Sequence, residues 1–400
     1  RHHDQTNQNR SRQTITEMDT TYVILQHYWW LVISLLAAAL VFLLFVQGGQ
    51  SLLYTIGRTS MQRDLIVNSL GRKWELTFTT LVTFGGALFA SFPLFYSTSF
   101  GGAFYVWTLI LLVFVIQAVA YQFRRKPNNF LGEKTYEYFL VINGIAGTFL
   151  LGAAVGTFFT GADFTIDRSN IANTTGNNII SQWNNRWYGL EALTDYRNIA
   201  LGTAILFLSR ILGLQYFLND IDNAEIKKRS SKRILCAAAP FLISFLTFFI
   251  SILFSDGLGV NPATGEIYRQ ELKYLDNILQ MPYVSIPMLA GIISVLWGIY
   301  IGWKKGSRRA VWWSGAGTMA TVLGLMLLAG WNNTCYYPSL ADMHSSLSIY
   351  NSSSSRFTLV VMSLVSAMLP VVIWYIWRTW KSINKTPITE NELKDEKHTY

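Results

Sequence analysis

The feature that most limits how this chain can fold is a series of long apolar blocks separated by polar segments. Each block is about 20 residues long, which is the length an α-helix needs to cross a ~30 Å hydrocarbon layer. Of the 400 residues, 51% are hydrophobic and 14% are charged, against roughly a quarter charged in soluble domains. The sequence therefore predicts an all-α protein, a polytopic transmembrane helical bundle. The nine predicted spans are Trp29–Phe45, Phe78–Phe95, Phe104–Tyr121, Phe139–Phe159, Leu201–Phe217, Ile234–Phe254, Pro287–Trp303, Val311–Gly330 and Thr358–Trp377.

The basic residues predict the orientation of this bundle. Lys and Arg gather in alternate loops, at 58–73, 124–134, 227–233 and 304–309, and again after the last span, whereas the intervening loops carry few. By the positive-inside rule the basic loops are cytoplasmic. Nine spans then give an outside N-terminus and a cytoplasmic C-terminus. Because the net charge of +9 is explained by these loops, it does not indicate a nucleic-acid partner.

The chain divides into three predicted regions. Residues 1–17 are polar, rich in Gln, Asn and Arg, and lack the apolar stretch of a signal peptide. We expect this leader to be disordered, or absent from the native protein, because Met18 is a more natural start. Residues 18–380 form the transmembrane bundle, and residues 381–400 form a cytoplasmic tail.

Two residue patterns predict how the helices meet lipid and each other. Small residues four apart, at Gly152/Gly156 and Gly86/Ala90, predict close helix packing. Aromatic residues at span ends predict an interfacial belt. They include Trp29, Trp30, Trp312, Trp313 and Trp377.

The histidines argue against a haem held by this chain. A membrane protein that ligates b-type haem needs axial His or Met side chains from its helices. None of the five histidines falls in the middle of a predicted span, and Met362 and Met368 in the last span are more typical of apolar filling. The histidines are His2, His3, His27, His344 and His398.

Two charged residues adjoin or enter predicted spans. Arg210 lies inside the fifth span, where inserting an arginine into the membrane costs roughly 2.5–3.5 kcal/mol. We therefore expect it to pair with an acid or to line a polar path. The sequence leaves open whether that role is structural or functional. Glu75 opens the second span from the inside. It is either an N-terminal helix acid favoured by the helix dipole or a proton-conducting carboxylate, and its position alone favours the first.

Four amides are placed where they can hydrogen-bond between helices. Gln47-Gly48-Gly49-Gln50 directly follows the first span, and its glycines permit close approach of another helix. Gln117 and Asn143 are isolated polar residues of the third and fourth spans. We find no phosphate-binding loop, dinucleotide fingerprint or hydrolase motif that would indicate a soluble catalytic site.

Several segments resemble subunit II of the cytochrome bd quinol oxidases. The most specific are Asn68–Glu75 (NSLGRKWE) and Thr83–Gly102 (TFGGALFASFPLFYSTSFGG). Tyr22–Trp30, Tyr121–Arg125 and the stretch from Ser346 to Met362 agree with them, so the resemblance covers nearly the whole chain from Met18.

The resemblance implies a heterodimeric terminal oxidase in a prokaryotic cytoplasmic membrane. Such complexes oxidise a membrane quinol and reduce dioxygen to water. In the family, haem b, haem d and the quinol site belong to subunit I, and subunit II is a partner of similar fold that ligates no haem. Subunit II supports the haem-bearing subunit and helps lead protons inward from the cytoplasm.

The resemblance also changes the interpretation of the candidate residues. The family carries an acid just after the tryptophan where Glu75 stands, which favours a proton route through Glu75. Many members have an Asp-Gly-Phe-Asp pattern where this chain has Gln47 and Gln50. Amides cannot titrate in the useful range but can order water, so we expect these two to line the route. No family role transfers to Arg210.

Two alternatives remain open at the level of sequence. A secondary transporter would predict inverted repeats and paired broken helices, and neither is seen. A purely structural scaffold subunit would leave Glu75 outside any proton path.

Overall fold

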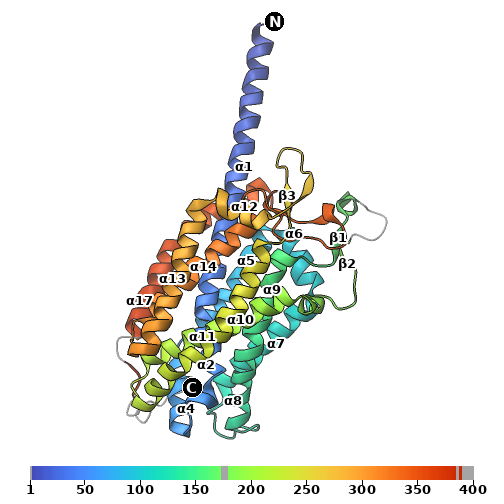
Figure 1. The fold of residues 1–400 in the computed structure, drawn as a ribbon. Helices are drawn as coiled ribbons and strands as arrows, with labels where there is room; N and C mark the ends of the chain where they lie inside the picture. The colour runs from blue at the N-terminus through green and yellow to red at the C-terminus, as the bar shows by residue number, and fades with distance from the viewer. Residues whose placement is uncertain (1, 173–178, 384–386, 390–400) are drawn as a thin grey trace.

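The computed structural model describes residues 2–172, 179–383 and 387–389. Most of this part is helical, and the long helices pack side by side into one bundle (Figure 1). The helices of ten or more residues are α1 (His2–Leu43), α4 (Ser60–Gly71), α5 (Trp74–Ser91), α7 (Phe104–Phe123), α8 (Glu133–Ile142), α9 (Thr148–Thr160), α10 (Tyr196–Asp220), α11 (Ala224–Leu253), α13 (Pro282–Lys305), α14 (Ala310–Gly330), α16 (Arg356–Ser366) and α17 (Leu369–Ile383).

Shorter elements connect these helices. Two π-helical turns, η1 (Ser97–Gly101) and η2 (Asn143–Gly147), continue α6 and α8, and antiparallel hairpins form from β1 with β2 and from β3 with β4. The remaining short elements are α2 (Phe45–Gln50), α3 (Leu53–Ile56), α6 (Pro93–Tyr96), α12 (Lys273–Gln280), α15 (Ile349–Ser352), η3 (Arg168–Ala172), η4 (Leu190–Thr194), η5 (Met343–Ser345), β1 (Phe164–Ile166), β2 (Ser181–Trp183), β3 (Gly257–Val260) and β4 (Ile267–Gln270).

The helical bundle predicted from the apolar blocks is confirmed. In the described part of the chain, eight helical segments are long and apolar enough to cross a membrane, and each contains one predicted span. The predicted span Phe78–Phe95 falls mainly on α5, which also holds Glu75 and four threonines and ends before Pro93. This helix is not among the eight segments. The count of nine and the direction of insertion stay predictions.

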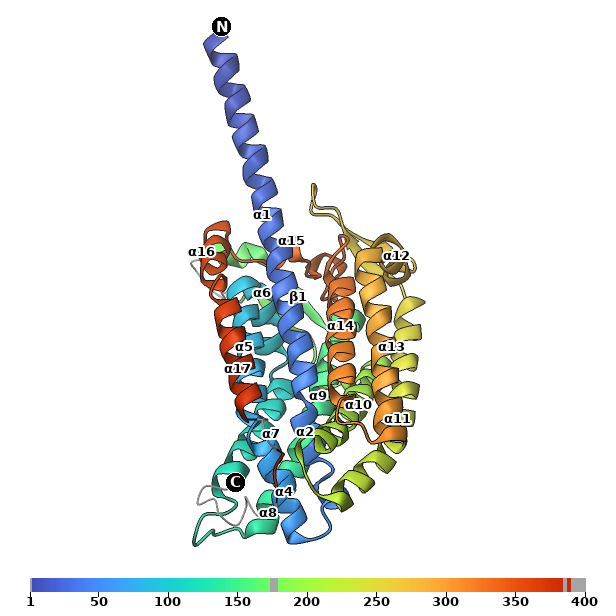
Figure 2. The same ribbon diagram turned by 90° about the vertical axis from the view of Figure 1, so that its left-hand side faces the viewer.

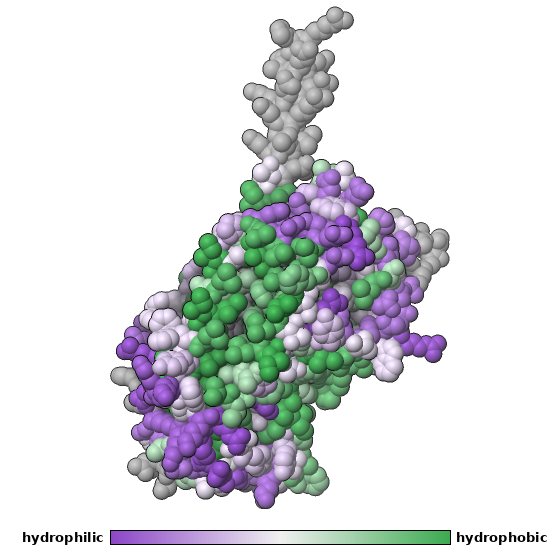
Figure 3. All heavy atoms as spheres, viewed as in Figure 1, coloured by the Kyte–Doolittle hydropathy of each residue, from purple (hydrophilic) through white to green (hydrophobic). Residues whose placement is uncertain are grey.

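The loops of the two predicted sides lie at opposite ends of the bundle. The hairpins and α12 lie at the end from which α1 projects, and α4 and the start of α8 lie at the other (Figures 1 and 2). Hydrophobic side chains cover the middle of the face in Figure 3, with hydrophilic ones toward both ends. The structure draws residues 2–17 as the projecting start of α1, and their disorder in solution stays a prediction.

Close helix packing was predicted at two pairs of small residues, and the structure shows it at Gly152/Gly156. A Cβ atom on Gly152 would lie 2.8 Å from Cα of Gly202, and one on Gly156 would lie 2.4 Å from Oδ1 of Asn198. These contacts join α9 to α10. By contrast, a Cβ atom on Gly86 would meet no atom within 4 Å, so this glycine serves no helix contact within the described chain.

The predicted aromatic belt is wrong for two of its tryptophans and stays a prediction for the others. Trp312, Trp313 and Trp377 are exposed at the bundle surface, but Trp29 and Trp30 are buried. Trp30 donates a hydrogen bond from Nε1 to the carbonyl oxygen of Met326 (2.9 Å). Its ring stays buried because α14 approaches closely there, through Gly330. These two tryptophans are core residues.

Candidate functional site

The predicted amides of the Gln47–Gln50 segment lie inside the bundle. Gln47 donates from Nε2 to Oε1 of Gln117 on α7 (3.2 Å), and Gln50 donates from Nε2 to the hydroxyl of Tyr121 (2.9 Å). All four side chains are buried. The segment reaches this depth because α2 directly continues α1 and because Gly48 lets α10 approach: a Cβ there would lie 1.8 Å from the carbonyl oxygen of Ser209.

Two further residues complete what we call the amide cluster. Asn143 lies in η2, which packs against α2 so closely that a Cβ on Gly144 would lie 2.4 Å from the backbone oxygen of Gln47. Trp74 stacks on Tyr121, with ring centroids 5.4 Å apart and planes 10° apart. The amide cluster is therefore Gln47, Gln50, Gln117, Asn143, Tyr121 and Trp74.

Among the residues that the structure describes, several polar atoms of the amide cluster have no hydrogen-bond partner. They are Oε1 of Gln47, Oε1 of Gln50, Nε1 of Trp74, Nε2 of Gln117, and Oδ1 and Nδ2 of Asn143. Buried polar atoms are nearly always hydrogen-bonded, to protein or to ordered water. An arrangement of donors and acceptors like this one suits a short chain of internal water molecules.

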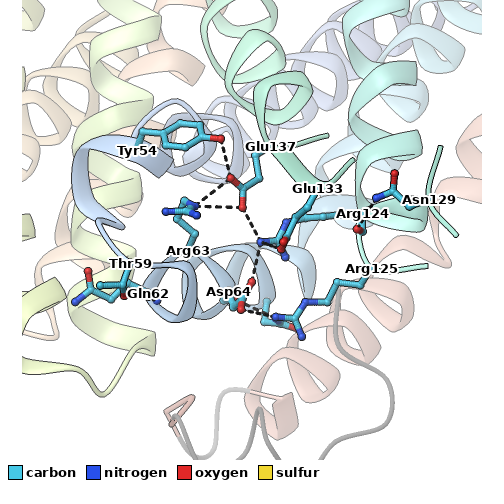
Figure 4. Close-up of polar contacts among 11 residues, drawn as sticks. Tyr54, Thr59, Gln62, Arg63, Asp64, Arg124, Arg125, Asn129, Glu133 and Glu137 are labelled. Atoms are coloured by element: carbon cyan, nitrogen blue, oxygen red, sulfur yellow. Dashed lines mark hydrogen bonds and ion pairs between the residues drawn. The ribbon is translucent and has the colours of Figure 1, made fainter. Parts of the chain in front are cut away.

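A cluster of charged residues lies at the end of the bundle where α4 and α8 begin (Figure 4). Its centre is the buried carboxylate of Glu137. This group accepts hydrogen bonds from the Tyr54 hydroxyl (2.7 Å), from Nε of Arg63 (3.0 Å) and from Nη2 of Arg124 (2.7 Å). Burial and the adjacent Glu137 raise the pKa of the Tyr54 hydroxyl, so Tyr54 stays a neutral donor.

The same arginine joins Glu137 to two other acids. Nη2 of Arg124 lies 2.7 Å from Oδ1 of Asp64 and 2.7 Å from Oε1 of Glu133, and Arg125 forms an ion pair with Asp64. The ionic cluster, as we call Arg63, Arg124, Arg125, Asp64, Glu133 and Glu137, balances three positive charges with three negative ones. Such balance is what makes a buried network of charges tolerable.

Helical spacing connects the two clusters into one polar column. On α7 and its C-cap, Gln117, Tyr121 and Arg124 are four and three residues apart, so they share one face. Arg124 belongs to the ionic cluster, and the other two belong to the amide cluster. Polar groups therefore continue from one end of the bundle into its interior.

Glu75 lies outside this column. It occupies the first turn of α5, next to Trp74, and its side chain is exposed on the surface of the described chain. The structure thus places Gln47 and Gln50 in one cluster with their partners Gln117 and Tyr121. It leaves Glu75 on an outward face. Its role as a proton carrier stays a proposal.

Arg210 is half-buried and has a hydroxyl partner in place of the expected acid. Its Nε donates to Oγ of Ser51 (2.9 Å), and its guanidinium carbon lies 5.2 Å from the centre of the Phe207 ring. Among the residues that the structure describes, no acid forms an ion pair with it. Ser51 directly follows Gln50, so Arg210 borders the amide cluster.

The described histidines do not suit a haem. His27 is hydrogen-bonded through Nδ1 to the carbonyl oxygen of Val23 (2.9 Å), and its ring contacts Trp331 and Tyr350. His344 is exposed in η5. Neither ring faces another histidine across the bundle interior, so these two histidines do not form a pair of axial ligands.

Comparison with protein families decides what kind of chain this is. The family model for cytochrome bd terminal oxidase subunit II matches residues 25–383. The chain belongs to this family. The resemblance noted around Asn68–Glu75 and Thr83–Gly102 is thereby confirmed. Membership makes the chain an integral membrane subunit of a terminal oxidase, a class of complexes with haem cofactors, and it does not support the alternative of a transporter.

Curated relatives and a solved structure agree with the assignment. The chain is 25% identical over 370 residues to cytochrome bd-I ubiquinol oxidase subunit 2 of Escherichia coli K12, covering 89% of this chain and 92% of the relative. It is 24% identical over 349 residues to cytochrome bd ubiquinol oxidase subunit 2 of Bacillus subtilis 168, covering 84% and 89%. A chain of the bd oxidase structure from Geobacillus thermodenitrificans has the same fold, with a TM-score of 0.55, 15% identity, and coverage of 90% and 98%.

Proposed function

We propose that this chain is the haem-free partner of a haem-bearing subunit I in a quinol oxidase of a prokaryotic cytoplasmic membrane. The complex oxidises quinol and reduces dioxygen to water, with haem b, haem d and the quinol site in subunit I. This chain supports that subunit and carries cytoplasmic protons toward it. The relatives named ubiquinol oxidase subunit 2 support the substrate, and the placement of the histidines supports the division of cofactors.

The observation that carries the proton-delivery proposal is the exposed face of α5. Glu75, Thr79, Thr83 and Gly86 are all exposed, at intervals of four, four and three residues. They form one stripe along the helix. An exposed carboxylate suits hydrocarbon poorly, and small and polar residues are typical of helix–helix contacts in membranes. The stripe therefore suits a protein partner, for which we propose subunit I.

The last span supports the same surface. In the most apolar stretch of the helical segment Arg356–Ser382, 11% of the residues are buried. The helix α16 packs on α1 and α5. A span with so little contact gains from a partner beside it. Together, α5, α16 and α17 present a surface that subunit I would cover.

In this arrangement Glu75 stands at the cytoplasmic edge of the interface. Protons cross a hydrocarbon layer only along titratable groups and water. Glu75 supplies a titratable group where cytoplasmic water meets the partner, and Thr79 and Thr83 continue the stripe inward. The amide side chains of the neighbouring amide cluster do not titrate but can order water, so in this proposal they line the route.

Replacing Glu75 tests the proposal. Glu75→Gln keeps the shape of the side chain and removes its titration, so quinol oxidase turnover per haem should fall at least about tenfold, or ~1.4 kcal/mol in the barrier. Glu225→Gln is the matched control, because Glu225 is also an exposed acid in the first turn of a helix on the predicted cytoplasmic side. Unchanged turnover in the assembled Glu75→Gln complex would favour the scaffold alternative.

A further inference from the structure

A cavity of about 200 Å³ lies at the end of the bundle that carries the hairpins, away from the ionic cluster and the amide cluster. Its lining comes from the end of α9, the starts of α7 and α10, and the loop from β2 to η4. A single water molecule needs about 10–15 Å³ of cavity volume. The cavity therefore has room for a small organic group, and nothing proposed above uses it.

One wall of the cavity carries an acid that has only neutral partners. The carboxylate of Glu191, in η4, accepts hydrogen bonds from Nε1 of Trp183 (2.7 Å) and from the backbone N–H of Gly189 (2.8 Å). Within the described chain, no basic side chain forms an ion pair with Glu191. The other acid of the lining, Asp195, is neutralised by Arg197 (2.6 Å). The lining therefore carries one uncompensated negative charge.

Three polar side chains of the lining direct donor protons to acceptors inside the protein. Oγ1 of Thr157 donates to the carbonyl oxygen of Ala154 (2.6 Å), and Oγ1 of Thr160 donates to Oδ1 of Asn198 (2.9 Å). Nδ2 of Asn198 in turn donates to the carbonyl oxygen of Ala192 (2.9 Å). The hydroxyl and amide oxygens keep capacity to accept further hydrogen bonds. Such a lining favours a ligand that donates them.

Aromatic side chains complete the lining. They are Trp107, Trp183 and Tyr337. Phe100 stacks on Trp107, with ring centroids 3.9 Å apart and planes 12° apart, and Phe164 stacks on Tyr337 at 5.1 Å and 16°, so both rings are held in place. The faces of aromatic rings attract cations, and cages of such rings bind ammonium groups. Negative charge, hydrogen-bond acceptors and aromatic rings together suit an organic ammonium ion.

We propose that this cavity binds a primary ammonium group, with the Glu191 carboxylate as its counter-ion. The ammonium donates hydrogen bonds to Glu191 and to the acceptors on α9 and α10. A quaternary ammonium has no N–H to donate and would leave those acceptors unpaired. Two sources share the required chemistry: the headgroup of an aminophospholipid in the outer leaflet, and a free small amine. The proposal is independent of the proton-delivery role, because it uses no residue of that route.

The test measures thermal unfolding of the purified, delipidated oxidase complex in detergent. Ethanolamine should raise the unfolding temperature in a saturable manner. Ethylene glycol, which has a hydroxyl group in place of the ammonium, should not raise it.

Nanodiscs distinguish the two sources of the ammonium group. The complex is placed in nanodiscs of phosphatidylethanolamine or of phosphatidylglycerol with the same acyl chains. A higher unfolding temperature in phosphatidylethanolamine identifies the lipid headgroup as the ligand. Stabilisation by ethanolamine alone, with no difference between the two lipids, identifies a free amine.

Three variants show whether the cavity is responsible. Glu191→Gln removes the charge and keeps the shape, so the ethanolamine concentration for half-maximal stabilisation should rise at least about tenfold, and the difference between the lipids should vanish. Ala154→Leu fills the cavity and leaves the acid in place, so it should have the same effect. Glu266→Gln, at an exposed acid between β3 and β4, is the matched control and should change neither result.

Two outcomes would overturn the proposal. If neither ethanolamine nor phosphatidylethanolamine stabilises the complex more than its control compound, the cavity holds water only. If the stabilisation persists at full strength in Glu191→Gln or in Ala154→Leu, the ammonium group binds elsewhere.

Discussion

At the scale of single residues, Glu137 is the buried acid at the centre of the ionic cluster. Its carboxylate binds two arginines and a tyrosine from α3, α4 and α7. Removing one member of a buried ion network typically costs 3–5 kcal/mol, because the remaining charges stay buried without compensation. The contact is thus a clamp that joins α8 to α3, α4 and the end of α7.

The clamp can be tested with a matched pair of substitutions on α8. Glu137→Gln should lower the free energy of unfolding by about 3 kcal/mol. Glu133→Gln, one helical turn earlier, should change it by less than about 1 kcal/mol, because Glu133 is largely exposed. Thermal unfolding of the complex in detergent measures both. Equal effects of the two substitutions would show that the buried clamp contributes nothing special.

The sequence could not separate these acids and arginines from ordinary loop charges. From the sequence, Arg63, Arg124 and Arg125 predicted only the membrane orientation. That prediction depends on how many basic residues a loop contains and not on which acids they bind. Asp64 and Glu137 come from segments more than 70 residues apart in sequence, and only the fold brings them onto one arginine. The spacing of Gln117, Tyr121 and Arg124 is the one signal that could have predicted a polar helix face.

At the scale of elements, the apolar blocks predicted the long helices because burial in lipid imposes length and composition directly. The short helix α2 and the π-turn η2 had no such signal. Their geometry depends on α10 and α7, which lie far away in sequence. The glycines of the Gln47–Gln50 segment were a usable clue, since they predicted the close approach that Gly48 makes to Ser209.

The close contact of Gly48 with Ser209 predicts that adding one methyl group at Gly48 lowers the stability of the protein. In Gly48→Ala the new Cβ would overlap the backbone of Ser209, so α2 and α10 must separate, at a cost of roughly 1–3 kcal/mol. Gly101→Ala is the control, because a Cβ there meets no atom within 4 Å. Thermal unfolding of the two variants decides the matter. If both lose the same stability, the tight contact between α2 and α10 is absent.

At the scale of the whole molecule, the exposed stripe on α5 and the sparsely buried last span describe a bundle that is incomplete alone. The resemblance to an oxidase subunit predicted a partner, but no sequence pattern told which face it covers. The exposure of Glu75 and Gly86 is the basis for the face that we propose for the partner. Only the fold shows which polar residues of a span point outward.

The proposed interface predicts where a bulky side chain is harmful. Gly86→Leu should reduce the amount of haem-bearing subunit that co-purifies with this chain by severalfold, because the leucine holds the partner helix away. Ala290→Leu, on the exposed surface of α13, should have no effect. Densitometry of the two subunits in the purified complex measures the ratio. Full recovery of the partner with Gly86→Leu would move the interface to another face.

The most direct test of the account is to follow proton uptake while the fully reduced complex reacts with dioxygen. In the Glu75→Gln complex the haem absorbance and the initial binding of dioxygen should match those of the unchanged complex, because we propose that the haems belong to the partner. Proton uptake from the medium should slow at least about tenfold. Proton uptake at the unchanged rate, or a haem spectrum altered by the substitution, would contradict a subunit that carries protons and holds no haem.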